Sequence, residues 1–168
     1  MTSKAAFSTD EWARVAASPL VAGMAITAAD PSGLWGLLQE ALAGGMSLAQ
    51  AKQSASANPL AHEVAEDIAN PETRTAIRDR MKAQFKGAQF ADVKTKAVEE
   101  LRAVAALVDA KAPNDAAGFK AWLREIAQKA AEAGKEGGFL GFGGVAVSDK
   151  ERATLDEISA ALSVSASA

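Results

Sequence analysis

A chain of 168 residues with a net charge of −3 is long enough to bury one hydrophobic core, and its lack of cysteine excludes disulfides, thiol nucleophiles and zinc–thiolate sites. Hydrophobic residues make up 49% of the chain and charged residues 23%, as in globular rather than disordered proteins. Alanine, the best helix former, is abundant, and β-branched residues never alternate with polar ones over the length of a strand. We therefore expect an all-α fold.

The first half of the chain is predicted to form short helices, each beginning at a cap or a proline. Ser8 to Glu11 form a capping box ahead of the first helix. Pro19 is expected in the first turn of a second helix, where its missing N–H does no harm. The other helices expected in this half begin at Pro31 or Ser32, at Ser47, at Pro59 after Asn58, and at Pro71 after Asn70.

The second half is predicted to form longer helices. Apolar residues recur every three or four positions from Ala91 to Lys111, the spacing of one buried helical face. A helix carrying Phe119 and Trp122 follows, and a capping box at 148–151 opens the last one. We expect eight or nine helices in a single compact domain over residues 1–162, with a frayed tail at 163–168.

The densest group of basic residues is expected to be a solvated helix face. Acidic residues stand among them, whereas nucleic-acid binding needs a cluster of uninterrupted positive charge. The group comprises Arg74, Arg78, Arg80, Lys82 and Lys86, with Glu72 and Asp79 between them. We expect no nucleic-acid partner.

The amino-terminal residues contain no apolar stretch that resembles a signal peptide. The most apolar run, residues 19–29, is about half of the ~20 residues that a membrane-spanning helix needs. We expect a cytoplasmic protein.

The only histidine limits the chemistry that the chain can perform. His62 and Glu66 are four residues apart on one helical face, so they are weak candidates for ligands of a divalent cation. An H-E-x-x-H site needs a second histidine where Glu66 stands, and di-iron bundles need two histidines and four glutamates. We interpret both side chains as exposed neighbours, and we predict no catalytic residue and no cofactor.

The glycine-rich residues 137–144 and the turn at 29–35 are the candidate contact sites. The glycine-rich stretch lacks the lysine of a phosphate loop, and a helix precedes it where a nucleotide fingerprint needs a strand. Phe139, Leu140 and Phe142 have no basic flank of the kind that anchors proteins on membranes, so we expect Phe139 and Phe142 to be buried. The candidate contact residues are Asp30, Ser32, Trp35, Gly138, Phe139, Gly141, Phe142 and Gly143.

Four distinctive stretches of the sequence are "FSTDEW", "SPLVAGMAITAADPSGLWG", "DAKAPNDAAGFKAWLREIAQ" and "EGGFLGFGGVAVSDKERATLDEISAAL". Together they resemble an uncharacterised family of small helical proteins of proteobacteria and cyanobacteria. Gly144, Ser148 and Glu151 give the chain a fainter similarity to TerB-like helical domains, which are associated with tellurite resistance, stress response and metal binding. They fit only part of the TerB-like pattern, because no aspartate precedes Gly144, so no metal site is carried over.

These observations favour a non-enzymatic helical interaction or regulatory module, acting in a bacterial stress response on a partner protein or a second copy of the chain. The alternative is a protein that binds a small ligand or a divalent cation through residues 29–35 and 137–144. A weaker alternative is binding to a membrane surface through Phe139, Leu140 and Phe142.

Overall fold

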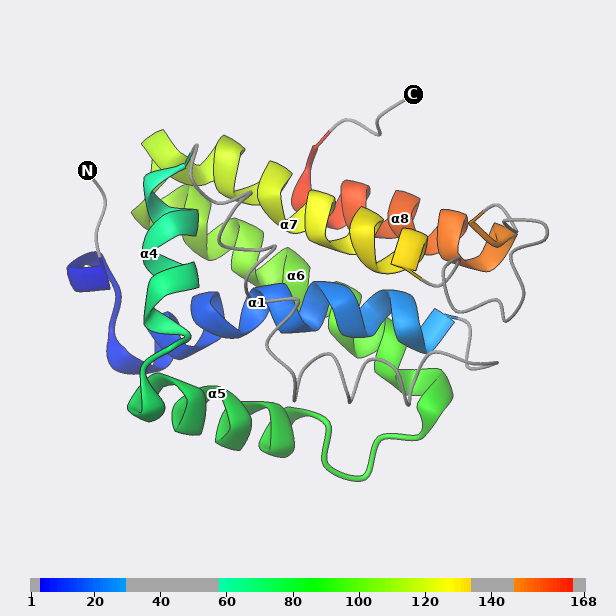
Figure 1. The fold of residues 1–168 in the computed structure, drawn as a ribbon, viewed down its shortest axis with the longest axis horizontal. Helices are drawn as coiled ribbons and strands as arrows, with labels where there is room; N and C mark the ends of the chain where they lie inside the picture. The colour runs from blue at the N-terminus through cyan, green and yellow to red at the C-terminus, as the bar shows by residue number, and fades with distance from the viewer. Residues whose placement is uncertain (1–3, 30–57, 134–146, 165–168) are drawn as a thin grey trace.

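Capping residues and apolar periodicity give helices throughout the part of the chain that the structure describes. The computed structural model describes residues 4–29, 58–133 and 147–164, and no strand occurs among them. The elements are a short 3-10 helix, η1 (Lys4–Ala6), and the helices α1 (Thr9–Ala29), α4 (Pro59–Asp67), α5 (Pro71–Gln84), α6 (Phe90–Lys111), α7 (Pro113–Ala133) and α8 (Asp149–Leu162) (Figure 1). The expected all-α class is confirmed.

The expectation of eight or nine helices, short ones first, is wrong for these described ranges, which hold six α-helices. Pro19 lies inside α1, which is 21 residues long, rather than starting a second helix. Because proline has no N–H, the carbonyl of Val15 loses its usual helical partner. The Ser18 hydroxyl donates a hydrogen bond to that carbonyl instead, at 2.6 Å. The helices expected from Pro31 or Ser32 and from Ser47 lie outside the described residues.

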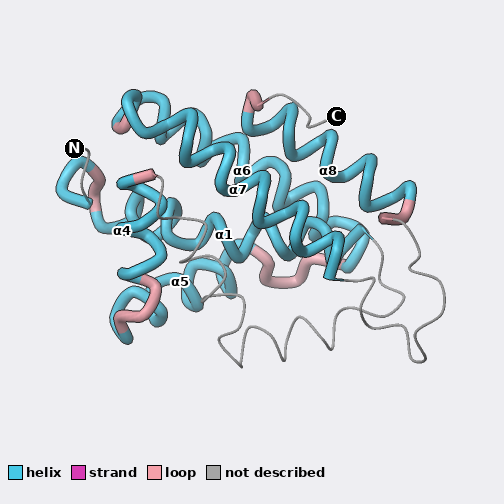
Figure 2. The backbone as a smooth tube through the Cα atoms, turned by 45° about the horizontal axis from the view of Figure 1, so that its top comes forward, coloured by secondary structure: helices cyan, strands magenta, loops and turns pink. Residues whose placement is uncertain are grey.

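Helix α1 forms the centre of the fold. Its residues from Val15 to Gly23 are buried except for the partly buried Leu20, and it contacts each of the other five helices. Figures 1 and 2 show α7 and α8 on one side of α1 and α5 on the other, and in Figure 1 α6 crosses behind α1. One hydrophobic cluster joins all six helices, with Leu60, Ile77, Leu101, Leu123 and Ile158 as members from the outer ones.

The length and composition of α1 would allow it to cross a membrane, and it is the one such helix among the residues searched, those that the structure describes. The expectation that the apolar run is too short is therefore wrong, because the helix continues through Pro19. However, 78% of its apolar window is buried inside the fold.

Two helical glycines provide a matched test of how α4 is fixed to α7. The Asn58 side chain caps α4 by accepting a hydrogen bond from the Ala61 N–H at 2.9 Å, and it donates to the Asp115 carbonyl of α7 at 3.0 Å. A Cβ atom added to Gly118 would lie 2.5 Å from Asn58 Nδ2, whereas one added to Gly23 would have no atom within 4 Å. Gly118 therefore leaves the space that the Asn58 cap occupies.

We expect Gly23→Ala to raise the free energy of unfolding by about 0.5–1 kcal/mol, since alanine is the better helix former. Gly118→Ala should lose that gain, because displacing the Asn58 cap costs about 1 kcal/mol. Urea unfolding measures both. In an Asn58→Gly background, Gly118→Ala should become as stabilising as Gly23→Ala. Equal gains for the two alanines in the parent chain would contradict the role of Asn58.

Candidate interaction site

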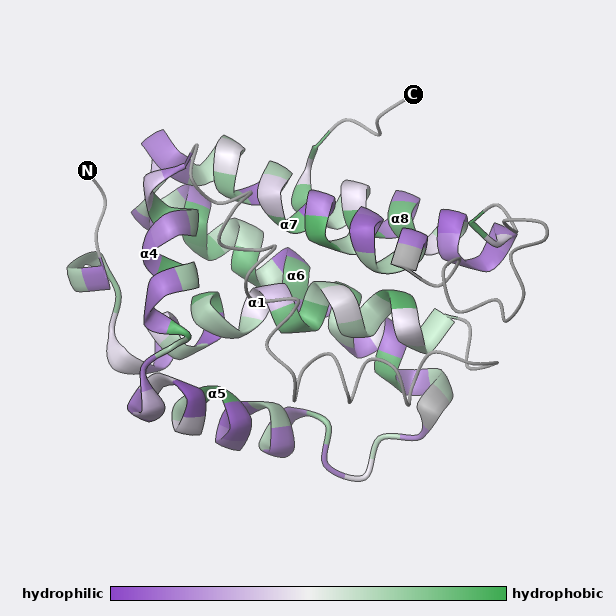
Figure 3. Ribbon diagram, in the orientation of Figure 1, coloured by the Kyte–Doolittle hydropathy of each residue, from purple (hydrophilic) through white to green (hydrophobic). Residues whose placement is uncertain are grey.

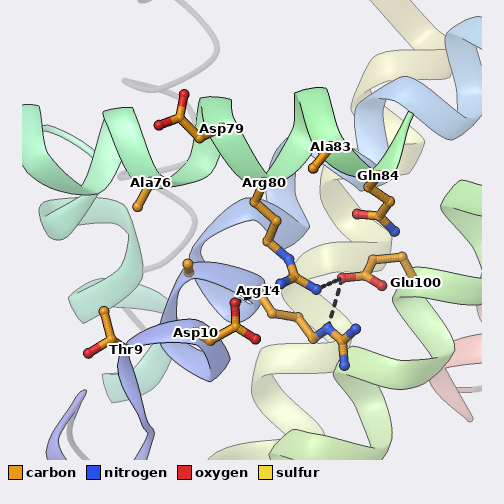
Figure 4. Close-up of a pocket in the computed structure, with 10 residues that line it drawn as sticks. Thr9, Asp10, Arg14, Ala76, Asp79, Arg80, Ala83, Gln84 and Glu100 are labelled. Atoms are coloured by element: carbon orange, nitrogen blue, oxygen red, sulfur yellow. Dashed lines mark hydrogen bonds and ion pairs between the residues drawn. The ribbon is translucent and has the colours of Figure 1, made fainter. Parts of the chain in front are cut away.

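An open groove with a volume of about 720 Å³ lies between α1 and α5. The residues that line the groove are spaced so that they share one face of each helix. Asp10, Ala13 and Arg14 are three and four residues apart on α1, and the residues from α5 are spaced in the same way. Three of the lining residues are alanines, and Glu100 of α6 lies at one end of the groove (Figure 4). The residues contributed by α5 are Ala76, Asp79, Arg80, Ala83 and Gln84 (Figure 4).

Two arginines converge on the buried Glu100 carboxylate at the end of this groove. Arg14 Nε and Arg80 Nη2 each donate a hydrogen bond to Glu100 Oε1 at 2.9 Å (Figure 4). The Glu100 side chain is only 7% exposed and that of Arg80 16%, whereas Arg14 is 36% exposed. Arg80 Nη1 also donates to Asp10 Oδ1 at 3.3 Å. The cluster thus joins three helices through one carboxylate.

The cluster leaves hydrogen-bonding groups unused. Among the described residues, Arg14 donates only through Nε, so its two terminal nitrogens have no acceptor there. Arg80 Nε and Gln84 Oε1 are buried and have no hydrogen-bond partner in the part of the chain that the structure describes. A guanidinium has five N–H donors and binds planar oxygen groups well. The exposed end of Arg14 can therefore receive a carboxylate or carbonyl oxygen from another molecule.

A second cluster, around Asp67, joins the amino-terminal segment to the helices beside the groove. Asp67 Oδ2 accepts hydrogen bonds from Lys4 Nζ, Trp12 Nε1 and Thr73 Oγ1 at 2.9, 2.7 and 2.8 Å. Burial raises the pKa of Asp67, but these three hydrogen bonds outweigh that effect, so the pKa lies below its usual value. The Glu63 carboxylate accepts two hydrogen bonds from the Lys4 backbone N–H.

The capping box predicted at Ser8–Glu11 is confirmed, and it makes one contact that the sequence pattern did not predict. Glu11 Oε2 accepts hydrogen bonds from the Ser8 N–H and from Lys111 Nζ, both at 2.7 Å. The hydrogen bond from Lys111, followed by that from Ser8, lowers the pKa of Glu11 to about 2. The start of α1 is thereby attached to the end of α6.

The candidate metal ligands lie on the exposed side of α4. His62 Nδ1 is 3.7 Å from Glu66 Oε2, and the two side chains are 52% and 68% exposed. Within the described part of the chain, no group of three or more histidine, aspartate or glutamate side chains could hold a metal ion. His62 and Glu66 stay weak candidates for ligands of a divalent cation.

The candidate contact residues of the 29–35 turn and the glycine-rich stretch lie outside the described residues. This holds for Asp30, Ser32, Trp35, Gly138, Phe139, Gly141, Phe142 and Gly143, and for the expected burial of Phe139 and Phe142. On the sequence alone, Arg80 and Glu100 are both expected on solvated helix faces, and Arg14 is no candidate site residue. Glu100 did carry a signal: it falls three residues after Ala97 and four before Val104, which places it at the edge of the buried face of α6.

Comparison with protein families, with curated proteins and with solved structures finds no match to this chain.

Proposed function

We propose that this chain is a non-enzymatic, cytoplasmic interaction module and that its protein partner docks in the groove between α1 and α5. The observation that carries this proposal is the Arg14–Glu100–Arg80 cluster at the end of an open groove. Glu100 fixes the Arg14 guanidinium, so the exposed end of Arg14 meets a partner with little loss of side-chain entropy. Arginine is enriched in protein interfaces and among the residues that contribute most to binding.

The shape of the groove supports a protein rather than a small molecule as its occupant. The groove is open to solvent, whereas small-ligand sites enclose most of the surface of their ligand. Ala13, Ala76 and Ala83 leave room for the backbone and side chains of an incoming segment. Asp10, at the rim, is 89% exposed and offers an acceptor to a donor on the partner.

A bulky side chain in the groove should prevent this docking. Ala83 is exposed on α5 and lines the groove, so Ala83→Trp fills it, and Ala121→Trp places the same side chain on the exposed surface of α7. We expect the tagged parent chain to capture one partner from an extract of its own cells at close to equimolar yield. Ala83→Trp should lower that yield by about tenfold or more, because interface energy is concentrated in a few central contacts.

The Ala121→Trp control distinguishes docking of the partner in the groove from binding of the partner to another surface of the chain. Ala121→Trp should capture the partner as well as the parent chain does. Equal yields from Ala83→Trp and the parent chain, or the absence of any equimolar partner of the parent chain, would rule out the groove as the docking site. Circular dichroism of each variant checks that its helices are intact.

A further inference from the structure

Helix α5 carries its exposed positive charge as a stripe. Arg74, Arg78 and Lys82 are each four residues apart and exposed, and Lys86 continues the spacing in the turn after the helix. Arg80 belongs to a different face, because its side chain turns inward to Glu100. In Figure 3, α5 is coloured mostly hydrophilic, in contrast to α1. The basic stripe, defined as Arg74, Arg78 and Lys82, therefore lies on the outside of the fold.

The stripe is poorly neutralised. Of its three members only Arg78 has an ion pair among the described residues, a 3.5 Å contact with Asp79 in which the side chains are 71% and 66% exposed. Like charges four residues apart destabilise a helix. The stripe thus opposes the stability of α5 in a protein whose overall charge is −3. An anionic partner would remove that repulsion.

The spacing indicates which anionic partner fits. Four residues of α-helix rise by about 6 Å, so acidic side chains four residues apart on a second helix match the three cations in register. Nucleic acid is the less suitable partner, because three cations on a protein with a net charge of −3 fall short of the basic cluster that nucleic-acid binding needs. Membrane association also needs an apolar face, but the buried residues of α5, Thr73 and Ile77, face into the fold.

We infer that the basic stripe of α5 binds an acidic helical segment, with carboxylates at four-residue spacing, in the partner protein. This inference rests on the proposal that the chain binds a protein, and it specifies the chemistry of that partner. The stripe and the groove lie on different faces of α5. Suppose that Ala83→Trp loses the partner while variants of the basic stripe keep it. The groove proposal would then stand, and the inference that the stripe binds the partner would be refuted.

Two synthetic helical peptides of identical composition test the inference by fluorescence anisotropy. One carries glutamates at four-residue spacing on a single face, and its isomer carries them evenly around the helix. We expect the parent chain to bind the single-face peptide about tenfold more tightly than the isomer, with affinity that falls as salt is added. Equal binding of the two peptides would overturn the inference, because only general attraction between opposite charges would then remain.

Charge-reversed variants locate the binding site. Arg74→Glu, Arg78→Glu and Lys82→Glu in one chain should abolish binding of the single-face peptide. Arg102→Glu, Lys150→Glu and Arg152→Glu change the net charge equally at exposed positions on α6 and α8, and should bind it like the parent chain. Equal loss in both triple variants would refute the stripe. Tighter, stripe-dependent binding of single-stranded RNA or of phosphatidylserine vesicles than of the peptide would also refute it.

A single substitution separates recognition from folding. Arg78→Glu should weaken peptide binding by about tenfold or more, while the melting temperature of the free chain stays equal or rises, because the substitution replaces repulsion from Arg74 and Lys82 with attraction. A merely structural role for Arg78 would lower the melting temperature along with the binding.

Discussion

Replacing Glu100 by alanine is expected to lower the free energy of unfolding by about 3 kcal/mol. Removing one partner of a buried ion pair is strongly destabilising because the remaining charge stays uncompensated. Here the Glu100 carboxylate serves both Arg14 and Arg80, and the latter is only 16% exposed. Arg14 can turn toward water, which keeps the expected cost at the lower end of the range for buried pairs. Urea or thermal unfolding measures it.

The neighbouring residue on α6 provides the control. Glu99 is exposed, so Glu99→Ala should change the free energy of unfolding by less than about 0.5 kcal/mol. Replacing Glu100 and Arg80 together by methionine should recover much of the lost stability, because buried ion pairs can often be exchanged for apolar side chains. If Glu100→Ala cost no more than Glu99→Ala, the cluster would not be holding α1, α5 and α6 together.

Replacing Asp67 by alanine is expected to cost about 2–3 kcal/mol. The substitution leaves the buried Trp12 Nε1 and Thr73 Oγ1 without their acceptor, and an unsatisfied buried donor is costly. Asp67→Asn should cost less, because its amide oxygen still accepts hydrogen bonds while the ion pair with Lys4 is lost. Glu66→Ala, one residue away and 68% exposed at the side chain, is the control and should be close to neutral.

Acid should weaken the same contacts. Because the pKa values of Asp67 and Glu11 are lowered in the folded chain, their contributions are complete above their unfolded pKa values, near 3.8 and 4.5. These contributions disappear as the pH falls through the folded values, which for Glu11 means down to about 2. The parent chain should therefore lose stability below about pH 4.5, and Asp67→Asn should flatten part of that loss. An unchanged acid profile in Asp67→Asn would contradict the assigned hydrogen bonds.

Local chemistry made several helix starts predictable. Asn58 and Asn70 cap α4 and α5 ahead of their prolines, and Ser148 with Glu151 completes the capping box of α8, all as the sequence indicates. Each of these signals lies within four residues, so it needs no knowledge of the tertiary structure. The prediction that Pro19 starts a second helix failed for a reason that is also local. The hydroxyl of Ser18 replaces the missing backbone donor and lets α1 continue.

The candidate site could not be predicted in this way, because its residues come from distant parts of the chain. Arg14 and Glu100 are 86 positions apart, and Arg80 and Glu100 are 20 apart. On the sequence each is an ordinary charged residue of an amphipathic helix. Only the packing of α5 and α6 against α1 brings them together, and the packing of α4 against α1 likewise brings Asp67 to Trp12.

The most direct test of the central proposal, that a partner protein docks in the groove between α1 and α5, is amide hydrogen exchange of the chain with and without its captured partner. Slower exchange should be confined to α5 and the first turns of α1, around Asp10 and Arg14. Protection confined to α7 and α8, with the exchange of α5 unchanged, would contradict the proposal.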